Sequence, residues 1–441
     1  MTCNCQSSIV NLFIMKKVLI ISYYWPPSGG AGVQRWLKFA KYLPDYGWEP
    51  HVYTPENPEA PAQDESLLND IPKEVVVIKQ PIFEPYGFYK KFTGNKKSVN
   101  AGFLSENKDS RKKFTEQLSI WVRGNLFIPD ARKFWIRPSI KFLKDYIKKE
   151  KIEIVISSGP PHSMHLIAME LKKQLGIKWI ADFRDPWTNI DFYKDLMLTK
   201  AADRKHHRLE REVLQTADEI ITIGKTMALE FEQVRGRKVQ VITNGFDTDD
   251  FELLDKEASD EFVLVHVGSI NADRNHEIFW EGLKQVCEEN TEFAKKLRIR
   301  FIGKLDYSVI ESMERHGLKK QFEQVDYVPH NEVNNYLINS NLLYLPLNNT
   351  PNSKGILSGK FFEYLATGKP ILGIGHPQGD AAEIMQETKA GQMFDFNDTE
   401  GVKSFLLSEF NRNTEKTKFK LGDRSAYSRK NLTSRLVQLF E

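Results

Sequence analysis

Short apolar runs alternate with amphipathic segments along most of the chain. The first run, residues 17–23, reads KVLIISY without a polar break until its end, as in a strand buried on both faces of a parallel sheet. Residues 33–43 then repeat apolar positions at helical spacing. The order of strand, glycine-rich turn and helix predicts the first unit of a doubly wound α/β domain.

The same alternation continues through the first half of the chain. It predicts strands at residues 49–54, 74–79, 152–157, 178–183, 219–223 and 239–243, and helices at 139–149, 163–175 and 198–216. Residues 81–134 show the least periodicity, and there we expect a loop excursion with one or two short helices.

A second series follows a polar, acidic stretch that ends at Glu261. Its predicted strands are residues 262–267, 298–302, 324–328, 342–345 and 370–374. Two such series predict two Rossmann-like, doubly wound domains facing each other. We expect a non-structural extension at 1–14, a first domain at 15–246, a second at 247–424, and a helix at 425–441 that crosses back to the first domain.

Length and composition agree with a globular chain of two or three domains. The 441 residues are 41% hydrophobic and 27% charged, and the net charge of +3 favours no particular partner. The charge is unevenly spread, since residues 85–150 contain 16 Lys and Arg against 6 Asp and Glu. This basic region is a candidate surface for an anionic membrane or a lipid-linked acceptor, and a solvated charged surface is the alternative.

Cysteine content and hydropathy favour the cytoplasm. The three cysteines, Cys3, Cys5 and Cys287, show no disulfide framework, which is typical of a reducing compartment. Residues 1–14 lack the basic start and apolar core of a signal peptide, and no run of 18 apolar residues occurs. We therefore expect a cytoplasmic protein, with a peripheral position on the inner face of the membrane as an extension of that prediction.

Loops that follow parallel strands are the places to look for ligand contacts. The first contains Gly30 and Gly32, whose backbone could approach an anion at a helix N-terminus, although a simple tight turn is the alternative. A dinucleotide fingerprint would need a third glycine where Arg35 stands, and the next strand ends at Thr54 without an acid for a ribose. A nicotinamide oxidoreductase is therefore disfavoured.

Two further loops of the first half carry polar groups. His162 follows a proline pair at a predicted helix start, where it could bond a sugar hydroxyl or merely cap the helix. The segment 181–187, which includes Arg184 and Asp185, could line a site for a polyhydroxylated ligand. An internal ion pair between an arginine and an aspartate of that segment is the alternative.

The second half offers cations for a phosphate. Gly268 and Ser269 follow a strand, Arg274 lies just beyond, and Lys304 follows the next strand. Arginine presents a planar fork that matches phosphate oxygens, and lysine adds a point charge. Because no Asp-x-Asp pair follows a convincing strand, we expect no metal and no cofactor.

The segment 351–370 is the most specific stretch of the sequence. Its small residues Gly355 and Ser358 lead into a predicted helix that carries Lys360 and Glu363. A glutamate one turn inside such a helix can accept both hydroxyls of a ribose, and a solvated helix residue is the alternative.

Several of these segments occur in the order found in family 4 glycosyltransferases. They are the turn at residues 26–30, Ser158–His162, Asp182–Trp187, Asn244–Asp247 and Lys360–Pro370. Residues 15–441 resemble that family, which has the GT-B fold with its active site between two Rossmann-like domains. The resemblance implies that Glu363 holds the nucleotide ribose, Arg274 and Lys304 the diphosphate, and backbone near Val328 the base. It also implies that Gly30 and Gly32 lie near the phosphates and the acceptor, and His162 near the transferred sugar.

The sequence departs from the family pattern at two positions. Gly355 stands where members have a first glutamate, and Ser269 where many have arginine. Lys360 or Ser358 are candidates to compensate for these losses.

The predicted activity is transfer of a sugar from a nucleoside diphosphate to a glycan or lipid-linked acceptor, retaining and metal-independent, in cell-surface polysaccharide or glycolipid synthesis. An epimerase or hydrolase on the same fold, and a non-catalytic nucleotide-sugar binder, are the alternatives. Nucleic-acid binding has no recognisable module behind it.

Overall fold

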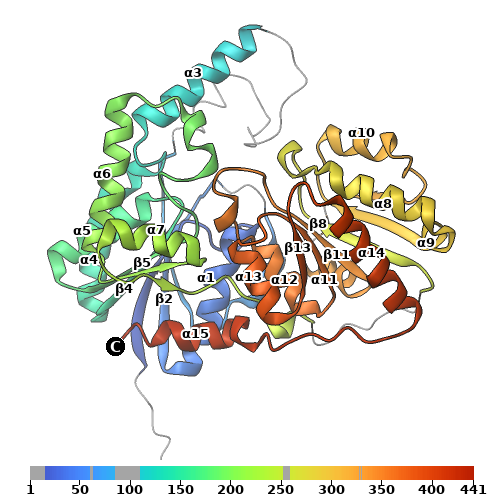
Figure 1. The fold of residues 1–441 in the computed structure, drawn as a ribbon. Helices are drawn as coiled ribbons and strands as arrows, with labels where there is room; N and C mark the ends of the chain where they lie inside the picture. The colour runs from blue at the N-terminus through green and yellow to red at the C-terminus, as the bar shows by residue number, and fades with distance from the viewer. Residues whose placement is uncertain (1–14, 60–62, 85–109, 252–258, 327, 329) are drawn as a thin grey trace, which may run out of the picture.

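The computed structural model of the chain describes residues 15–59, 63–84, 110–251, 259–326, 328 and 330–441. The predicted extension at 1–14 and the part of the basic region at 85–109 lie outside the described residues. The described chain forms two lobes, each built on one parallel sheet (Figure 1). This confirms the predicted α/β class with two doubly wound domains.

The first sheet has the strand order β3-β2-β1-β4-β5-β6-β7, and every neighbouring pair is parallel. Its strands are β1 Lys16–Ile21, β2 Trp48–Pro55, β3 Val76–Gln80, β4 Ile154–Gly159, β5 Lys178–Phe183, β6 Glu219–Thr222 and β7 Gln240–Val241. Its helices are α1 Ala31–Tyr42, α3 Ser110–Leu126, α4 Lys133–Glu150, α5 Ser163–Leu175, α6 Lys200–Thr216 and α7 Lys225–Arg235.

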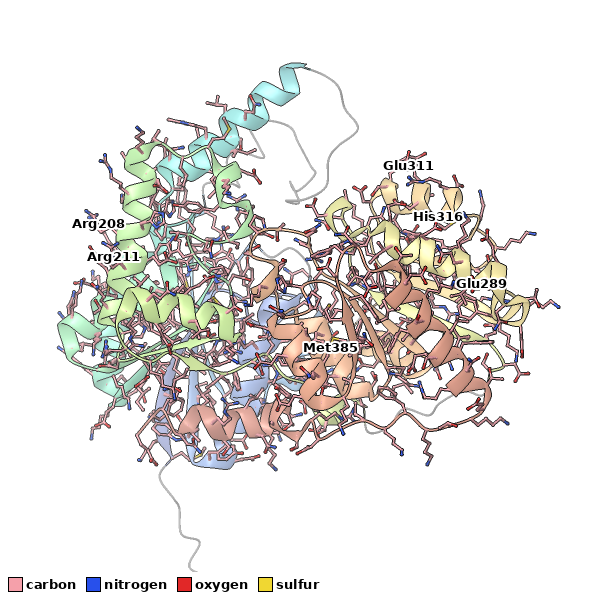
Figure 2. All side chains as sticks on the ribbon, in the orientation of Figure 1. Arg208, Arg211, Glu289, Glu311, His316 and Met385 are labelled. Carbon is pink, nitrogen blue, oxygen red and sulfur yellow. The ribbon has the colours of Figure 1, made fainter. Side chains whose placement is uncertain are left out.

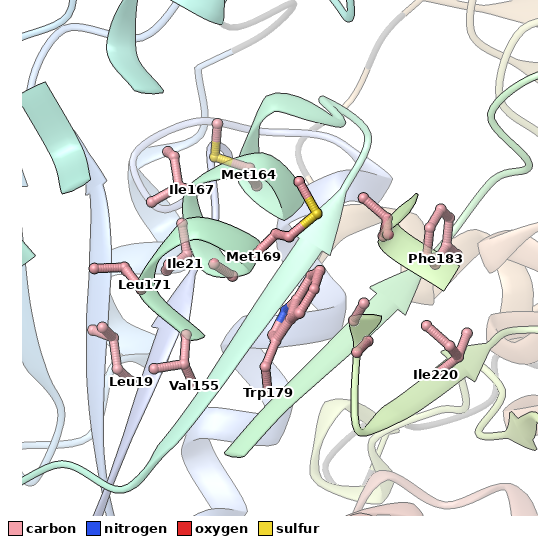
Figure 3. Packing of buried hydrophobic residues seen from close by; sticks show 14 of the residues in the cluster. Leu19, Ile21, Val155, Met164, Ile167, Met169, Leu171, Trp179, Phe183 and Ile220 are labelled. Atoms are coloured by element: carbon pink, nitrogen blue, oxygen red, sulfur yellow. The ribbon is translucent and has the colours of Figure 1, made fainter. Parts of the chain in front are cut away.

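Separate hydrophobic clusters cover the two faces of this sheet. Alternate residues of one strand point to opposite faces, so Leu19 and Ile21 pack with Val155 and Trp179 on one side. Figure 3 shows these side chains near Met164 and Leu171 of α5. Val18 and Ile20 join the other cluster, which α1 covers. Because the strands and helices are buried, the connecting loops at the carboxyl ends of the strands are left to form the candidate site.

The second sheet has the order β10-β9-β8-β11-β12-β13 and is also fully parallel. Its strands are β8 Phe262–Val267, β9 Leu297–Ile302, β10 Phe322–Val325, β11 Leu342–Pro346, β12 Ile371–Ile374 and β13 Gly391–Phe394. Its helices are α8 Glu277–Glu289, α9 Thr291–Lys296, α10 Tyr307–Arg315, α11 His330–Ile338, α12 Gly359–Thr367, α13 Asp380–Thr388 and α14 Thr399–Thr414.

The predicted strands lie within a few residues of the observed ones, but three details differ. The four-residue edge strand β13 was not predicted, because so short a run shows no period. The prediction of short helices before residue 134 was wrong, since α3 has 17 residues. Helix α4 begins at Lys133 rather than at 139, because Trp135 is buried and stacks on Tyr53 at 4.8 Å between ring centroids.

The last helix, α15 Arg429–Val437, packs against α1 of the first lobe. The chain thus returns from the second lobe to the first at its end, as Figure 1 shows in red. Phe440 meets the Trp48 ring edge-on at 4.8 Å, and Arg435 donates to the Val241 carbonyl at 2.8 Å. The two lobes are therefore joined by two chain crossings.

The outer helices carry solvated charges. Figure 2 shows Arg208 and Arg211 on α6 at one side of the molecule, and Glu289 and Glu311 on α8 and α10 at the other. Among the described helices, none is both long and apolar enough to cross a membrane.

Candidate active site

The loops after β8 and β9 pack against each other in the second lobe. Gly268 has φ +107° and Gly303 has φ +119°, which favour glycine at both positions. A Cβ on Gly303 would lie 3.1 Å from the Gly268 carbonyl carbon and oxygen, and a Cβ on Gly268 would lie 2.5 Å from Lys360 Nζ. The backbone of Gly268 therefore lies directly beside the Lys360 ammonium group, in the first turn of α12.

Lys360 is a cation that its surroundings disfavour. Burial, and then the charge of Arg274, lower the pKa of the Lys360 ammonium to about 7, although Glu363 acts in the opposite direction. Burial also lowers the pKa of Arg274. Within the part of the chain that the structure describes, no carboxylate forms an ion pair with Lys360. Two crowded cations beside a glycine backbone are suited to bind an anion, although Glu363 near Lys360, and Asp191 and Asp273 near Arg274, offset part of their charge.

Helix α12 sets the positions of these groups. Tyr364 is buried, and its hydroxyl accepts a hydrogen bond from Val267 N at 2.8 Å, which ties the helix to the end of β8. Lys360, Glu363 and Tyr364 share one helix face because they are three and four residues apart. Ser358 precedes the helix, and its Oγ is buried without a partner among the described residues. The N-terminus of α12 thus adds its dipole to the two cations.

The remaining second-lobe candidates lie around this centre. Lys304 is exposed, and its carbonyl accepts from Ile270 N at 3.1 Å, so it lies beside the loop that contains Ser269, which is also exposed. Gly268, Arg274, Lys360 and Glu363 therefore lie together. Val328 is half-buried, and the two residues next to it in the chain, 327 and 329, lie outside the described residues.

In the first lobe, Arg184 joins three loops. Its Nη1 donates to the Gly32 carbonyl at 3.0 Å, and its Nη2 donates to the Pro160 carbonyl. A Cβ on Gly32 would lie 2.7 Å from Arg184 Nη1, so the close approach needs glycine there. Gly30 has φ +98° and is exposed just before α1. Asp185 is exposed, although the surrounding protein raises its pKa by desolvation.

His162 stacks on Trp187 with ring centroids 4.5 Å apart and an interplanar angle of 1°. Burial, followed by the neighbouring His165, keeps the pKa of His162 well below its usual value, so the ring is neutral. Its Nδ1 is buried without a described partner. The helix-capping interpretation is wrong, because His162 makes no side-chain cap. Asp130 does so instead, accepting from Ser163 N and Oγ, both at 2.8 Å.

Asp182 pairs with a residue that the sequence analysis weighed only as an obstacle to a dinucleotide site. Its Oδ1 lies 2.7 Å from Arg35 Nη2, and its Oδ2 accepts from Trp36 Nε1 and Ser158 Oγ. The alternative of an ion pair inside 181–187 does not describe Asp182, whose ionic partner is Arg35. The sequence signal for this ion pair was Arg35 itself, an arginine on the inward face of α1 at the position where a dinucleotide fingerprint would have glycine.

Two contacts that the sequence analysis missed join the lobes beside the site. Asp380, at the start of α13, accepts from Thr226 N at 3.1 Å and from Thr226 Oγ1 at 2.7 Å. Asn348 accepts from Arg274 Nε at 2.5 Å and donates to Asp191 Oδ2 of the first lobe at 3.3 Å. Arg274 is therefore connected to the first lobe through Asn348. No group of three metal-ligating side chains occurs in the described ranges.

Comparisons with known proteins bear on the fold of the chain. The model of Glycosyltransferase Family 4 matches residues 103–250. No curated protein matches the chain by sequence. Sucrose-phosphate synthase of Thermosynechococcus elongatus has a similar structure, with a TM-score of 0.61, 13% identity, and coverage of 97% of this chain and 98% of its own.

Two further solved structures have the same fold. TarM of S. aureus, in complex with Fondaparinux, alpha-GlcNAc-glycerol and UDP, has a TM-score of 0.61 at 11% identity, over 97% of this chain and 100% of its own. A putative UDP-N-acetylglucosamine 2-epimerase of Listeria monocytogenes has a TM-score of 0.55 at 10% identity, over 97% and 96%. Residues 103–250 are thus similar to family 4 glycosyltransferases, and the two parallel sheets of the chain have the GT-B fold of these solved structures.

Proposed function

We propose that the protein transfers a sugar from a nucleoside-diphosphate sugar to an acceptor hydroxyl, with retention of the anomeric configuration and without a metal ion. The observation that carries the proposal is the Arg274–Lys360 pair beside Gly268 at the start of α12. Such a group can bind the two phosphates of the donor and stabilise the charge that develops as they leave.

The residues around this pair have distinct roles in the proposal. Glu363 would accept the ribose hydroxyls, and backbone near Val328 would pair with the base. Ser358, Ser269 and Lys304 would add donors to the phosphate oxygens. Gly30 and Gly32 would leave room for the phosphates on the side of the first lobe, and Asp185 would contact the sugar.

The reaction would break the bond between the anomeric carbon and the phosphate oxygen, and form a bond to the acceptor oxygen on the same face. The acceptor proton would pass to the departing phosphate, so no protein base is needed. His162 is neutral and held by its stack on Trp187, which suits a hydrogen bond to the transferred sugar rather than proton transfer.

Gly355 lies close to the first lobe. A Cβ at this position would lie 3.3 Å from Thr226 of the first lobe, tighter than ordinary van der Waals contact. A larger residue would therefore press on the lobe contact between Thr226 and Asp380. Because Gly355 replaces the usual glutamate, a nucleotide-sugar binder without transfer activity stays an alternative. The similar epimerase structure makes an epimerase or hydrolase a second alternative.

Thermal shift with nucleoside diphosphates and their sugars tests the donor site. One of them should raise the melting temperature of the wild-type protein, because a ligand that binds only the native state stabilises it. Glu363→Ala and Arg274→Ala should each reduce that shift sharply. Unchanged donor affinity and turnover in both variants would contradict the assignment. Turnover without an acceptor would indicate the hydrolase or epimerase, and binding without transfer to any acceptor would indicate the binder.

The acceptor is proposed to be a glycan or a lipid-linked sugar, in cell-surface polysaccharide or glycolipid synthesis. The basic region at 85–150 would bring the protein to an anionic inner membrane surface from the cytoplasm. Co-sedimentation with acidic vesicles at low salt tests this, and absence of binding there would remove the membrane part of the proposal.

A further inference from the structure

A buried acid and a buried arginine lie side by side in the first lobe, outside the groups considered so far. Glu84 follows β3, and Arg132 lies just before α4. Their side chains are 6% and 13% exposed, and Arg132 Nη2 lies 3.7 Å from Glu84 Oε2. That separation is too long for a hydrogen bond. Glu84 Oε2 and Arg132 Nε are both buried without a partner among the described residues.

Tyr23 holds the side chains of Glu84 and Arg132 in place. Its hydroxyl donates to Glu84 Oε1, and it accepts from Arg132 Nη2 at 3.2 Å and from Glu59 N at 2.8 Å. The Arg132 guanidinium also lies over the Tyr23 ring, 4.6 Å from its centroid. Three interactions therefore hold the two side chains in place while leaving one polar atom of each unused.

Unused buried polar atoms are costly, so a cluster of them needs an explanation. A hydroxyl group can donate and accept at the same time, so one that reached both unused atoms would donate to Glu84 Oε2 and accept from Arg132 Nε. An ammonium or phosphate ion would suit only one member of the pair. The geometry therefore favours a neutral, hydroxylated ligand.

The surroundings of the pair also fit a sugar. Phe83 and Phe134, each close in sequence to one member of the pair, are 56% and 44% exposed, and their rings meet edge-on at 5.9 Å. Lys133 lies 5.1 Å from the centroid of Phe134. Exposed aromatic rings offer an apolar surface to the C–H face of a sugar ring, and these two rings are one and two residues from Glu84 and Arg132 along the chain.

The pair is connected to the candidate active site. Asp130 accepts from Arg132 N at 2.9 Å and also caps α5, which begins directly after His162. On the other side, the Tyr23 ring meets Tyr24 edge-on at 4.9 Å, and Tyr24 lies beneath Arg184. Both connections lead to the carboxyl ends of β1, β4 and β5, where the acceptor must meet the donor sugar.

We propose that Glu84, Arg132 and Tyr23 form an acceptor subsite that binds a hydroxyl of the acceptor's sugar ring, with Phe83 and Phe134 as its apolar wall. The subsite rests on the proposed transferase function and names the acceptor as a neutral sugar residue at this point. Glu84 and Arg132 act by binding and positioning the acceptor, not by proton transfer.

Glycoside binding tests the subsite directly. Saturation-transfer NMR would be measured with methyl glycosides of glucose, galactose, mannose and N-acetylglucosamine, in the presence of UDP. At least one should bind the wild-type protein, and Glu84→Gln should weaken its binding tenfold or more. Arg132→Lys, which keeps the charge but loses the planar fork, should weaken it similarly. Glu150→Gln is the matched control, because Glu150 pairs with Lys17 elsewhere in the same lobe.

The outcomes separate this inference from the donor site. Equal glycoside binding by the wild-type protein and by folded Glu84→Gln or Arg132→Lys would overturn it, as would wild-type protein that binds no glycoside. Nucleotide thermal shifts on the same samples should be unchanged in both variants. If no nucleotide raised the melting temperature of the wild-type protein, the proposed function would be contradicted instead.

Discussion

Arg35 and Asp182 form an ion pair in which the side chains are 1% and 0% exposed. Burial alone would raise the pKa of Asp182, but Arg35 and the hydrogen bonds from Trp36 and Ser158 lower it overall. Arg35 Nη1 also donates to the Thr243 carbonyl at 2.8 Å. The pair thus ties α1, β4, β5 and the end of the first domain together beneath the glycine loop.

Asp182→Asn should be strongly destabilising. The amide keeps the shape of the carboxylate but leaves Arg35 buried without an opposite charge, which costs about 3–5 kcal/mol in comparable sites. Urea denaturation should show a lower midpoint with little change in slope. Glu150→Gln, which breaks the partly exposed pair with Lys17, is the control and should change the midpoint little. Equal midpoints for wild-type protein and Asp182→Asn would show that the buried pair contributes nothing to stability.

The fold could be predicted because its signals are local. The continuous apolar run of β1 and the regular return of strands from β4 to β7 each follow from periodicity within a few residues. β13 and the length of α3 could not be predicted, because β13 has four residues and α3 is polar along much of its length.

The candidate site could be predicted only in part. Loops after parallel strands drew attention to Gly268, Arg184 and His162, since the ends of parallel strands meet at one edge. Lys360 became a candidate through the segment 351–370 instead. The partners were not predictable, because Asp130 lies 33 residues from Ser163, and Asp380 lies 154 residues from Thr226. Contacts at such separations depend on packing of the whole chain, which no local pattern encodes.

Nucleotide affinity should depend on pH through Lys360. In the free protein the pKa of Lys360 is lowered to about 7, so the cation is present below that pH and is lost above it. A bound diphosphate favours the charged form, so binding above pH 7 takes up a proton. UDP affinity should therefore fall as pH rises from 7, by up to about tenfold per unit. Isothermal titration between pH 6 and 9 would measure it.

Lys360→Met is the control for this pH dependence. It should weaken UDP binding at pH 6.5 by roughly tenfold or more, since a hydrogen bond to a charged group contributes about 1.5–3 kcal/mol. It should also flatten the slope above pH 7, whereas titration of UDP itself would leave the slope equal in both proteins. Equal slopes would therefore place the titrating group elsewhere.

Gly268→Ala should impair donor binding more than stability. The new Cβ would lie 2.5 Å from Lys360 Nζ, and the φ of +107° is unfavourable for alanine, so the lysine must move away from the anion site. The matched control is Gly236→Ala at the end of α7, which has φ +71° and nothing within 4 Å of the added Cβ. Both should lose stability, by about 1 kcal/mol for the control, but only Gly268→Ala should reduce the UDP thermal shift.

Asp380→Asn should loosen the contact between the lobes. The Asp380 carboxylate accepts from both the amide and the hydroxyl of Thr226 at the start of α7, and a Cβ on Gly224 would lie 2.3 Å from its Oδ2. An asparagine turns one acceptor into a donor that faces these donors, so the contact should weaken. Small-angle scattering of the nucleotide-free protein should then give a larger radius of gyration, and the KM for the donor should rise severalfold.

Glu383→Gln is the control for this interlobe contact, because Glu383 pairs with Lys225 at 2.6 Å in a solvent-exposed position on the same two helices. Such pairs are screened and contribute little, so its scattering and KM should match those of the wild-type protein. If both variants behave as wild type, the Thr226–Asp380 contact does not hold the lobes together. If both open the molecule equally, charge between α7 and α13 matters rather than the buried cap, and the specific role of Asp380 is lost.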